Sequence, residues 1–280
     1  MQKITLKLTS ILFISRLFLY SCGGAEEEVT NDETTVEEPE VEITTDEAPT
    51  YLLPSPLQIA ELFKSAGLTY IGDLTTPSEN VNNLTTKHDQ KLNFGVYSAD
   101  MAYCLMNNQT QESINYLKTL KELSEKIWMM DIINAMGLSE RLEANVGNED
   151  SLTYIMADMQ MQMDGYLEEN GMSYMGSVIF AGAWIESMYI GVEVNKSEKN
   201  ERLIGKLSEQ AIILDGIIAS IKQTDEDKEF AELVTDLEGL NKHFDAFDDD
   251  STEEYMFTDE QIASLGEDIV ALRTKIIGGE

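Results

Sequence analysis

Two carboxylates, Asp100 and Glu186, stand in stretches that carry no other charge. Asp100 is the only charged residue between Leu92 and Met106, and Glu186 is the only one between Met172 and Val192. Two carboxyl groups that face one cavity repel each other and lose hydration, which raises at least one pKa. Such a pair could share a proton or polarise a ligand. Asp100 and Glu186 are therefore the candidate residues for a ligand site or a buried polar site.

A plainer interpretation gives these carboxylates no shared cavity. Each would lie at a helix boundary in solvent, or accept a hydrogen bond from a tyrosine hydroxyl, because buried polar groups are generally bonded. The tyrosines that could serve are Tyr97, Tyr103 and Tyr189. We favour this interpretation, so the sequence assigns no catalytic residue.

The two segments have the composition of closely packed helices. Small residues share one face of each, namely Gly95, Ala99 and Ala102 in the first and Gly176, Ala183, Ser187 and Gly191 in the second. Such faces let helices approach closely. The segment around Glu186 is also long enough to cross a membrane. We expect a buried central helix instead, because a carboxylate is costly in lipid.

No proline follows Pro77 in the remaining 203 residues. A proline-free stretch with repeated apolar spacing predicts helices, and short loops make neighbouring helices antiparallel. We expect an all-α fold, a multi-helix antiparallel bundle of about eight to nine helices, with two sub-bundles meeting near residues 146–148 as the alternative. The expected helices are 57–66, 89–106, 109–130, 132–144, 149–169, 172–194, 199–222, 226–246 and 259–277. Ser55-Pro56 and Thr258-x-x-Gln261 have the form of helix starts.

The N-terminus has the parts of an export signal. Lys3 and Lys7 precede an apolar run from residue 8 to 20, and the small Ser21 precedes Cys22. The run is too short to span a bilayer core of about 30 Å. A thiol at this position can be alkylated with diacylglycerol, and each buried acyl methylene contributes about 0.8 kcal/mol.

Leu19-Tyr20-Ser21-Cys22 resembles the lipobox of bacterial lipoproteins. The resemblance implies that residues 1–21 are a signal peptide and that Cys22 is lipidated with diacylglycerol and a further acyl chain such as palmitate. An uncleaved membrane anchor is the alternative, which Arg16 disfavours because a central arginine costs roughly 2.5 to 3.5 kcal/mol in a spanning helix. No other cofactor is expected.

Residues 22–50 form an expected tether between the lipid and a domain at 51–280. From residue 23 to 50 the chain has eleven acidic residues and no basic one, so it should be a disordered, self-repelling spacer. Its run Glu26-Glu27-Glu28 resembles the acidic export signals of some Bacteroidota lipoproteins. That resemblance implies a place in the outer membrane of the cell envelope, with exposure at the surface.

Charge limits the partners. The formal net charge of −33 becomes −36 when Lys3, Lys7 and Arg16 leave with the signal peptide. Such a surface repels phosphate backbones, so we expect no nucleic acid partner. It also argues against electrostatic attachment to anionic lipid, which leaves the acyl chains of Cys22 as the membrane attachment.

The sequence offers few residues for thiol chemistry or for metal binding. Cys104 has no second thiol once Cys22 is lipidated, and its apolar neighbours favour burial. His88 and His243 are the only histidines and neither follows a glutamate at three residues, so a di-metal carboxylate site lacks its ligands. The acidic loop 245–259 has no glycine where a calcium loop turns. We predict no metal site.

The run Leu92-Asn93-Phe94-Gly95-Val96-Tyr97-Ser98-Ala99-Asp100-Met101-Ala102-Tyr103, with Asn108-Gln109-Thr110-Gln111 and Tyr116-Leu117, resembles uncharacterised all-helical lipoproteins of Bacteroidota. The resemblance implies a fold and a location without an activity. We expect a lipid-anchored envelope protein with a non-enzymatic binding or scaffolding role toward an envelope protein or small ligand. The alternatives are a small-ligand receptor or hydrolase that uses Asp100 and Glu186, and an adaptor with a methionine-rich surface at Met156, Met159, Met161 and Met163.

Overall fold

The computed structural model describes residues 53–145, 148–245 and 256–278, and every regular element in these ranges is helical. The α-helices are α1 (Pro56–Ser65), α2 (Lys87–Met106), α3 (Thr110–Lys126), α4 (Met130–Ala135), α5 (Leu138–Ala144), α6 (Glu149–Glu169), α7 (Ser173–Ser197), α8 (Glu201–Ser208), α9 (Ala211–Thr224), α10 (Ala231–Asn241) and α11 (Asp259–Gly278). Short 3₁₀ helices are η1 (Gly72–Leu74), η2 (Ser78–Asn83) and η3 (Lys242–Phe244). The predicted all-α fold is confirmed. Cys22, the signal peptide and the tether lie outside the described residues.

Two predicted helix starts are confirmed in atomic detail. The Ser55 hydroxyl accepts a hydrogen bond from the Gln58 backbone N–H at 3.2 Å, while the Gln58 side chain accepts from the Ser55 N–H at 2.7 Å. Thr258 and Gln261 exchange the same pair of bonds before α11. These reciprocal bonds satisfy backbone donors that a helix start leaves free.

The described residues contain more helices than the sequence predicted, because turns divide two of the expected helices, and a third turn shortens another. The expected helix 109–130 stops at Lys126, since Trp128 has left-handed backbone. The expected helix 132–144 breaks at Gly137, also left-handed, which separates α4 from α5. The expected helix 199–222 is interrupted at Glu209 and Gln210, between α8 and α9.

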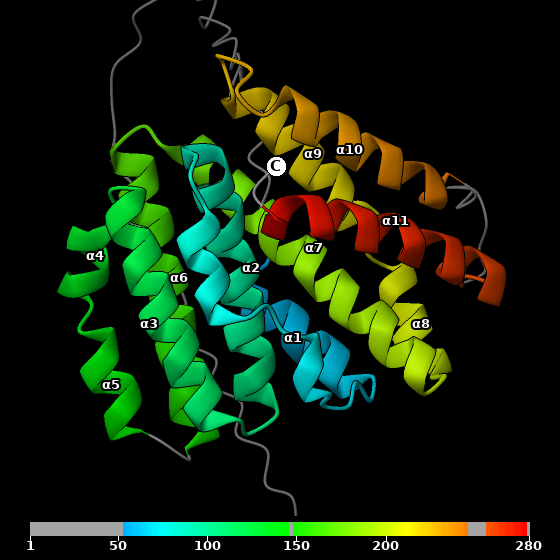
Figure 1. Ribbon diagram of the computed structural model, residues 1–280, viewed down its shortest axis with the longest axis horizontal. Coiled ribbons are helices and arrows are strands. Elements are labelled where there is room, and N and C mark those ends of the chain that lie inside the picture. Colours follow the sequence, from blue (N-terminus) through cyan, green and yellow to red (C-terminus); the bar gives the residue numbers. More distant parts are fainter. Residues whose placement is uncertain (1–52, 146–147, 246–255, 279–280) are drawn as a thin grey trace, which may run out of the picture. The chain divides into compact units, whose positions relative to one another are not determined.

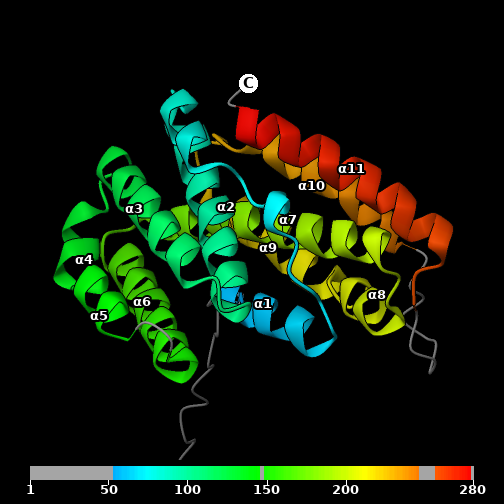
Figure 2. The same cartoon turned by 60° about the horizontal axis from the view of Figure 1, so that its bottom comes forward.

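Helices α2 and α7 cross at the centre of the fold and touch backbone to backbone (Figures 1 and 2). A Cβ on Gly95 would lie 1.8 Å from the Ile179 carbonyl oxygen, and one on Gly182 would lie 2.1 Å from that of Leu92. The prediction of a small face on α2 holds at Gly95. On α7 the closest approach uses Gly182, which the predicted small-residue face did not include.

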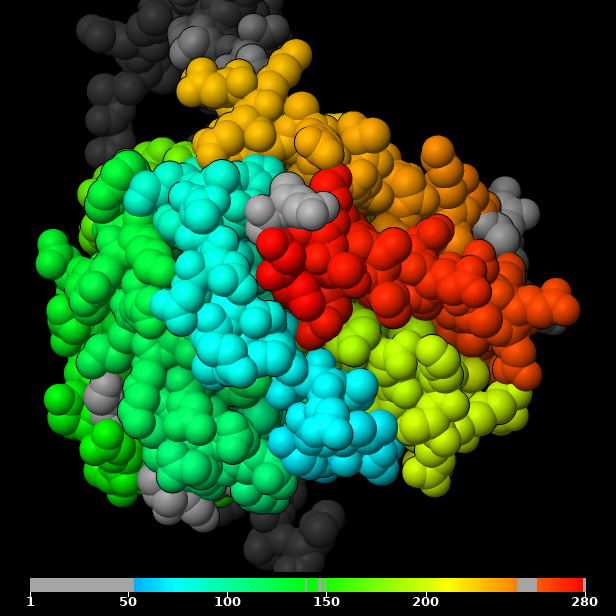
Figure 3. Space-filling view, viewed as in Figure 1, coloured from blue at the N-terminus to red at the C-terminus, as the bar shows by residue number. Residues whose placement is uncertain are grey.

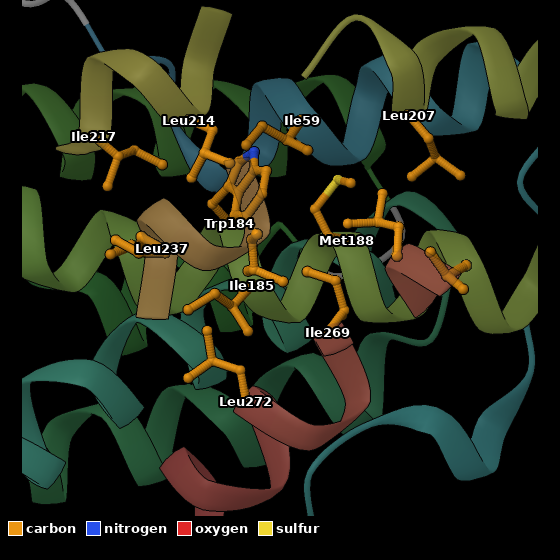
Figure 4. Close-up of a cluster of buried hydrophobic side chains, with 14 of the residues drawn as sticks. Ile59, Trp184, Ile185, Met188, Leu207, Leu214, Ile217, Leu237, Ile269 and Leu272 are labelled. Carbon is orange, nitrogen blue, oxygen red and sulfur yellow. The ribbon is translucent and has the colours of Figure 1, made fainter. Parts of the chain in front are cut away.

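Buried apolar side chains form two clusters, one chiefly from α7–α11 and the other chiefly from α2–α6. Both central helices contribute to both clusters, so they join the helices into one core rather than two sub-bundles. Figure 4 shows Trp184 of α7 between Leu214 of α9 and Ile59 of α1, with Ile185 reaching toward Leu272 of α11. The Trp184 indole N–H donates to the Gln210 side-chain oxygen at 3.2 Å.

Among the described residues, one helix, α7, is long and apolar enough to cross a membrane. In the fold, 89% of its most apolar stretch is buried by other parts of the chain. A helix that is apolar all round is expected wherever neighbours cover every face. The burial agrees with the expected central helix.

Four helices end in the same kind of turn, in which one residue is left-handed and the next N–H bonds back into the last helical turn. The closing bonds are Leu68 N to Phe63 O, Gln109 N to Cys104 O, Met129 N to Ser124 O and Met172 N to Leu167 O. The left-handed residues are Gly67, Asn108, Trp128 and Gly171. Glycine and asparagine are usual there, whereas other side chains cost roughly 1–2 kcal/mol. Trp128 is the exception.

Candidate functional site

The fold brings Asp100 and Glu186 together at the α2–α7 crossing and adds Arg273 from α11. Both carboxylate residues are 0% exposed, and Arg273 is 8% exposed. Asp100 and Glu186 are each within hydrogen-bonding reach of Thr76, which lies between η1 and η2. These four residues are called the buried polar cluster below.

Arg273 holds the cluster together. Its Nε donates to Glu186 Oε2 at 2.6 Å and its Nη2 donates to Glu186 Oε1 at 2.8 Å, which makes the pair bidentate. The same Nη2 donates to the Thr76 hydroxyl at 2.9 Å and to the Leu74 carbonyl at 3.3 Å. One guanidinium therefore joins α11, α7 and the segment between η1 and η2. A planar guanidinium suits such a set of acceptors better than an ammonium.

Asp100 is less completely bonded. Its Oδ2 accepts from the Thr76 backbone N–H at 3.0 Å, but its Oδ1 has no donor among the described residues. Burial raises the pKa of Asp100 well above its usual range, and the Glu186 carboxylate raises it further, against the opposing effects of Arg273 and the Thr76 N–H. A protonated Asp100 gains an O–H that can donate to Glu186. The cluster is then electrically neutral, with one carboxylate, one guanidinium and one carboxylic acid.

In the part of the chain that the structure describes, two tyrosines next to the cluster bond to backbone carbonyl groups rather than to its carboxylates. Tyr97 donates its hydroxyl to the Pro77 carbonyl at 3.1 Å, and Tyr116 donates to the Thr76 carbonyl at 3.0 Å. The Arg273 guanidinium carbon lies 3.9 Å from the centre of the Tyr189 ring. Burial, followed by the charge of Asp100, raises the pKa of Tyr97 and of Tyr116, so both hydroxyls remain donors.

The structure agrees with the meeting of the two carboxylates, whereas neither lies at a helix boundary in solvent or accepts a hydrogen bond from one of the three named tyrosines. Asp100 and Glu186 do meet, but the partners that hold them are Arg273 and Thr76 rather than Tyr97, Tyr103 or Tyr189. The Tyr103 hydroxyl bonds to the backbone of Thr69 and Ile71 instead. Arg273 was missed, although its spacing from Ile269 and Ile276 places it on the core face of α11. That spacing is the signal that could have found it.

Neither carboxylate of the buried polar cluster lines the cleft next to it. The adjacent cleft, of about 710 Å³, lies between α3 and the segment that contains η1 and η2. Thr75, Pro77 and Tyr116 line it, and they separate it from the carboxylates behind. Figure 3 shows this N-terminal segment (cyan) beside the end of α11 (red) on the surface. The cluster can hold a proton and connect three elements, and both of its carboxylates are fully buried.

The structure also places the other candidate groups from the sequence, namely the free cysteine, the methionine series and the possible metal ligands. Cys104 is buried, and burial together with the charge of Asp100 raises the pKa of its thiol to about 12, which keeps it a thiol. Met156, Met159 and Met163 are buried in the α2–α6 cluster, and only Met161 of that series is exposed. In the described ranges no group of three or more His, Cys, Asp or Glu residues could hold a metal ion. Most of the acidic loop, residues 246–255, lies outside those ranges.

Comparison with protein-family models, with curated proteins and with solved structures finds no match to this chain. The resemblance to Bacteroidota lipoproteins therefore stays a prediction from the sequence.

Proposed function

We propose that this chain is a lipid-anchored protein of the cell envelope whose helical domain binds or scaffolds a partner without chemical catalysis. The observation that carries the second half of the proposal is the closed state of the buried polar cluster. Both carboxylates are fully buried, and Glu186 is fully engaged by Arg273. The proposal therefore places interactions with other molecules on the outside of the domain.

The anchor rests on the sequence alone. The export signal, the small residue before Cys22 and the acidic tether form one consistent arrangement. Two or more acyl chains on one thiol give stable attachment, whereas one chain gives reversible attachment. An outer-membrane location, exposed at the surface, is part of the same proposal through Glu26-Glu27-Glu28.

The receptor or hydrolase alternative would need the same carboxylates to meet a ligand. A general acid or base must come within hydrogen-bond reach of the atom that it protonates or deprotonates. Asp100 and Glu186 could do so only if Arg273 and the segment around Thr76 moved away. The exterior role requires no such movement and is therefore the better supported function.

Metabolic labelling with an alkyne-bearing palmitate tests the anchor, with Cys22→Ser as the matched control. We expect label on the wild-type chain in the membrane fraction and neither label nor membrane association for the variant. Affinity capture of the acylated chain from its own membranes, followed by mass spectrometry, then tests the binding role. Partners that are also retained by Asp100→Asn and Glu186→Gln chains would agree with an exterior surface. Loss of every partner in both variants, with the fold intact, would favour the carboxylate-based alternative.

A further inference from the structure

A groove of about 480 Å³ lies between the C-terminal part of α7 and the first half of α11. The two helices run in opposite directions (Figure 1). At one end of the groove the Lys199 ammonium donates to the Asp259 carboxylate at 2.7 Å, and further along the helices Gly266 faces Val192. Pockets that hold small ligands usually measure about 300–1,000 Å³. The groove is therefore large enough for a small ligand.

The lining of the groove is mostly apolar. A Cβ on Gly266 would lie 2.6 Å from Val192 Cγ1, so the two helices approach closely where that glycine stands. Small side chains on α11 leave space above this contact. The apolar residues that line the groove are Val192, Ile262, Ala263, Gly266 and Val270. A hydrocarbon chain laid along these residues would leave water, which favours its binding.

One polar side chain in the groove has an unused donor. Asn195 lines the groove and is only 8% exposed. Its Oδ1 accepts a hydrogen bond from the Asn200 backbone N–H at 2.9 Å, which fixes the side chain, whereas its Nδ2 has no acceptor among the described residues. Buried polar groups are generally bonded. An unpaired donor in the wall of an apolar groove therefore points to an oxygen atom of a ligand.

Two lysines line the same end of the groove as Asn195. Lys196 pairs with Glu193 at 3.2 Å, and Lys199 pairs with Asp259. Such exposed ion pairs contribute little to stability, so the Lys196 ammonium can turn to a ligand at small cost. Glu267, the third acidic residue of the groove, lies about two helical turns beyond Asp259, toward the other end. The donors are thus gathered at one end, and the apolar lining continues to Val270.

We propose that this groove binds a single-chain amphiphile that ends in a carboxylate. The carboxylate accepts hydrogen bonds from Asn195 Nδ2 and the Lys196 ammonium, and the hydrocarbon chain lies along α11 toward Val270. The inference names a ligand class for the binding role proposed above and rests on that role, but it does not depend on the lipid anchor. An apolar segment of a protein partner is the competing occupant.

The test is a calorimetric titration of the full chain carrying Cys22→Ser with dodecanoate, below its micelle concentration. Dodecyltrimethylammonium, which has an alkyl chain of similar length and a cationic head, is the control ligand. The formal charge of −33 favours the cation at any unspecific place on the surface. We expect dodecanoate to bind at one site and at least tenfold more tightly than the cation.

Three variants locate the site. Asn195→Asp keeps an oxygen that can accept from the Asn200 N–H and replaces the free donor by a second oxygen, so dodecanoate should bind at least tenfold more weakly. Ala263→Phe fills the groove from an exposed position of α11 and should weaken binding by at least the same factor. Ala271→Phe changes another exposed alanine of α11, outside the groove lining, and should leave binding unchanged. The unfolding midpoints of the two phenylalanine variants should agree, which separates loss of binding from loss of fold.

The proposal is overturned if dodecanoate binds the parent chain no more tightly than it binds Ala263→Phe, or if the cation binds as tightly as dodecanoate. It is also overturned if the parent chain binds no dodecanoate and Ala263→Phe loses a captured protein partner. That last result would leave the exterior binding role standing, with a protein in the groove. The anchor can be correct in every case, because Cys22→Ser removes it from the measurement.

Discussion

Arg273 and Glu186 form a bidentate ion pair in which Nε lies 2.6 Å from Oε2 and Nη2 lies 2.8 Å from Oε1. The two residues come from α11 and α7, 87 positions apart in the chain. Burial of Arg273 lowers its pKa, whereas the hydrogen bond to Glu186 and the charge of Glu186 raise it. The net effect is a raised pKa for Arg273. The Arg273 guanidinium therefore stays charged, and Asp100 is the cluster carboxyl whose pKa is raised.

Replacing Asp100 by asparagine should change how stability depends on pH. Because the folded pKa of Asp100 is raised, the native state binds more protons than the unfolded state above about pH 4. The contribution of Asp100 to wild-type stability should therefore fall with rising pH, by about 1.4 kcal/mol per unit, until the folded pKa of Asp100 is reached. Asp100→Asn lacks this slope and should become increasingly more stable than wild type as pH rises. Urea unfolding between pH 4 and 8 measures it.

The control for this measurement is Asp131→Asn, which changes an exposed aspartate. Its stability curve should run parallel to that of the wild type. If Asp100→Asn also runs parallel, Asp100 does not hold a raised pKa in the folded chain.

Removing Arg273 alone should be severely destabilising. Arg273→Met leaves the Glu186 charge buried without its partner, and breaking a buried pair in this way costs about 3–5 kcal/mol. The double variant Glu186→Gln/Arg273→Met removes both charges and should recover much of that loss. Lys222→Met, which breaks an exposed pair with Glu238, should cost less than about 1 kcal/mol. If Arg273→Met and the double variant lose the same free energy of unfolding, the unpaired charge of Glu186 is not the cause of the loss in Arg273→Met.

The close contact between α2 and α7 predicts that the effect of a glycine-to-alanine substitution on stability depends on the position of the glycine. Gly95→Ala and Gly182→Ala place a Cβ against backbone oxygens of the facing helix, so the helices must separate. We expect losses of roughly 1–3 kcal/mol or more for each. Gly165→Ala, on α6 with open space at its Cβ, should instead stabilise by about 0.5–1 kcal/mol. Chemical unfolding of the three variants provides the comparison. No difference between the two kinds of site would contradict the close crossing.

Thiol titration distinguishes the two cysteines. Cys104 is buried with its pKa raised to about 12, so it should not react with an aromatic disulfide reagent in the native chain. After denaturation the acylated chain should show one reactive thiol, because Cys22 is blocked. Two reactive thiols would mean an unmodified Cys22, and a fast native reaction would mean that Cys104 is accessible.

The sequence was enough to predict the all-α class and the two central helices, α2 and α7, because apolar spacing and the absence of proline after Pro77 depend on local structure. It missed turns at positions such as Trp128, where tertiary context imposes a left-handed backbone that the residue type disfavours. It chose Asp100 and Glu186 because isolated charges in apolar helices need partners. It missed Arg273 and Thr76 because these partners come from segments distant in sequence, and their approach depends on how the helices pack.

The most direct test of the account is the intact mass of the protein purified from its own membranes, with sequencing of its N-terminal peptide. We predict a chain that begins at Cys22 and carries the mass of a diacylglycerol and a further acyl chain on that residue. A chain that begins at Met1 with an unmodified Cys22 thiol would contradict the anchor, and with it the location of the helical domain.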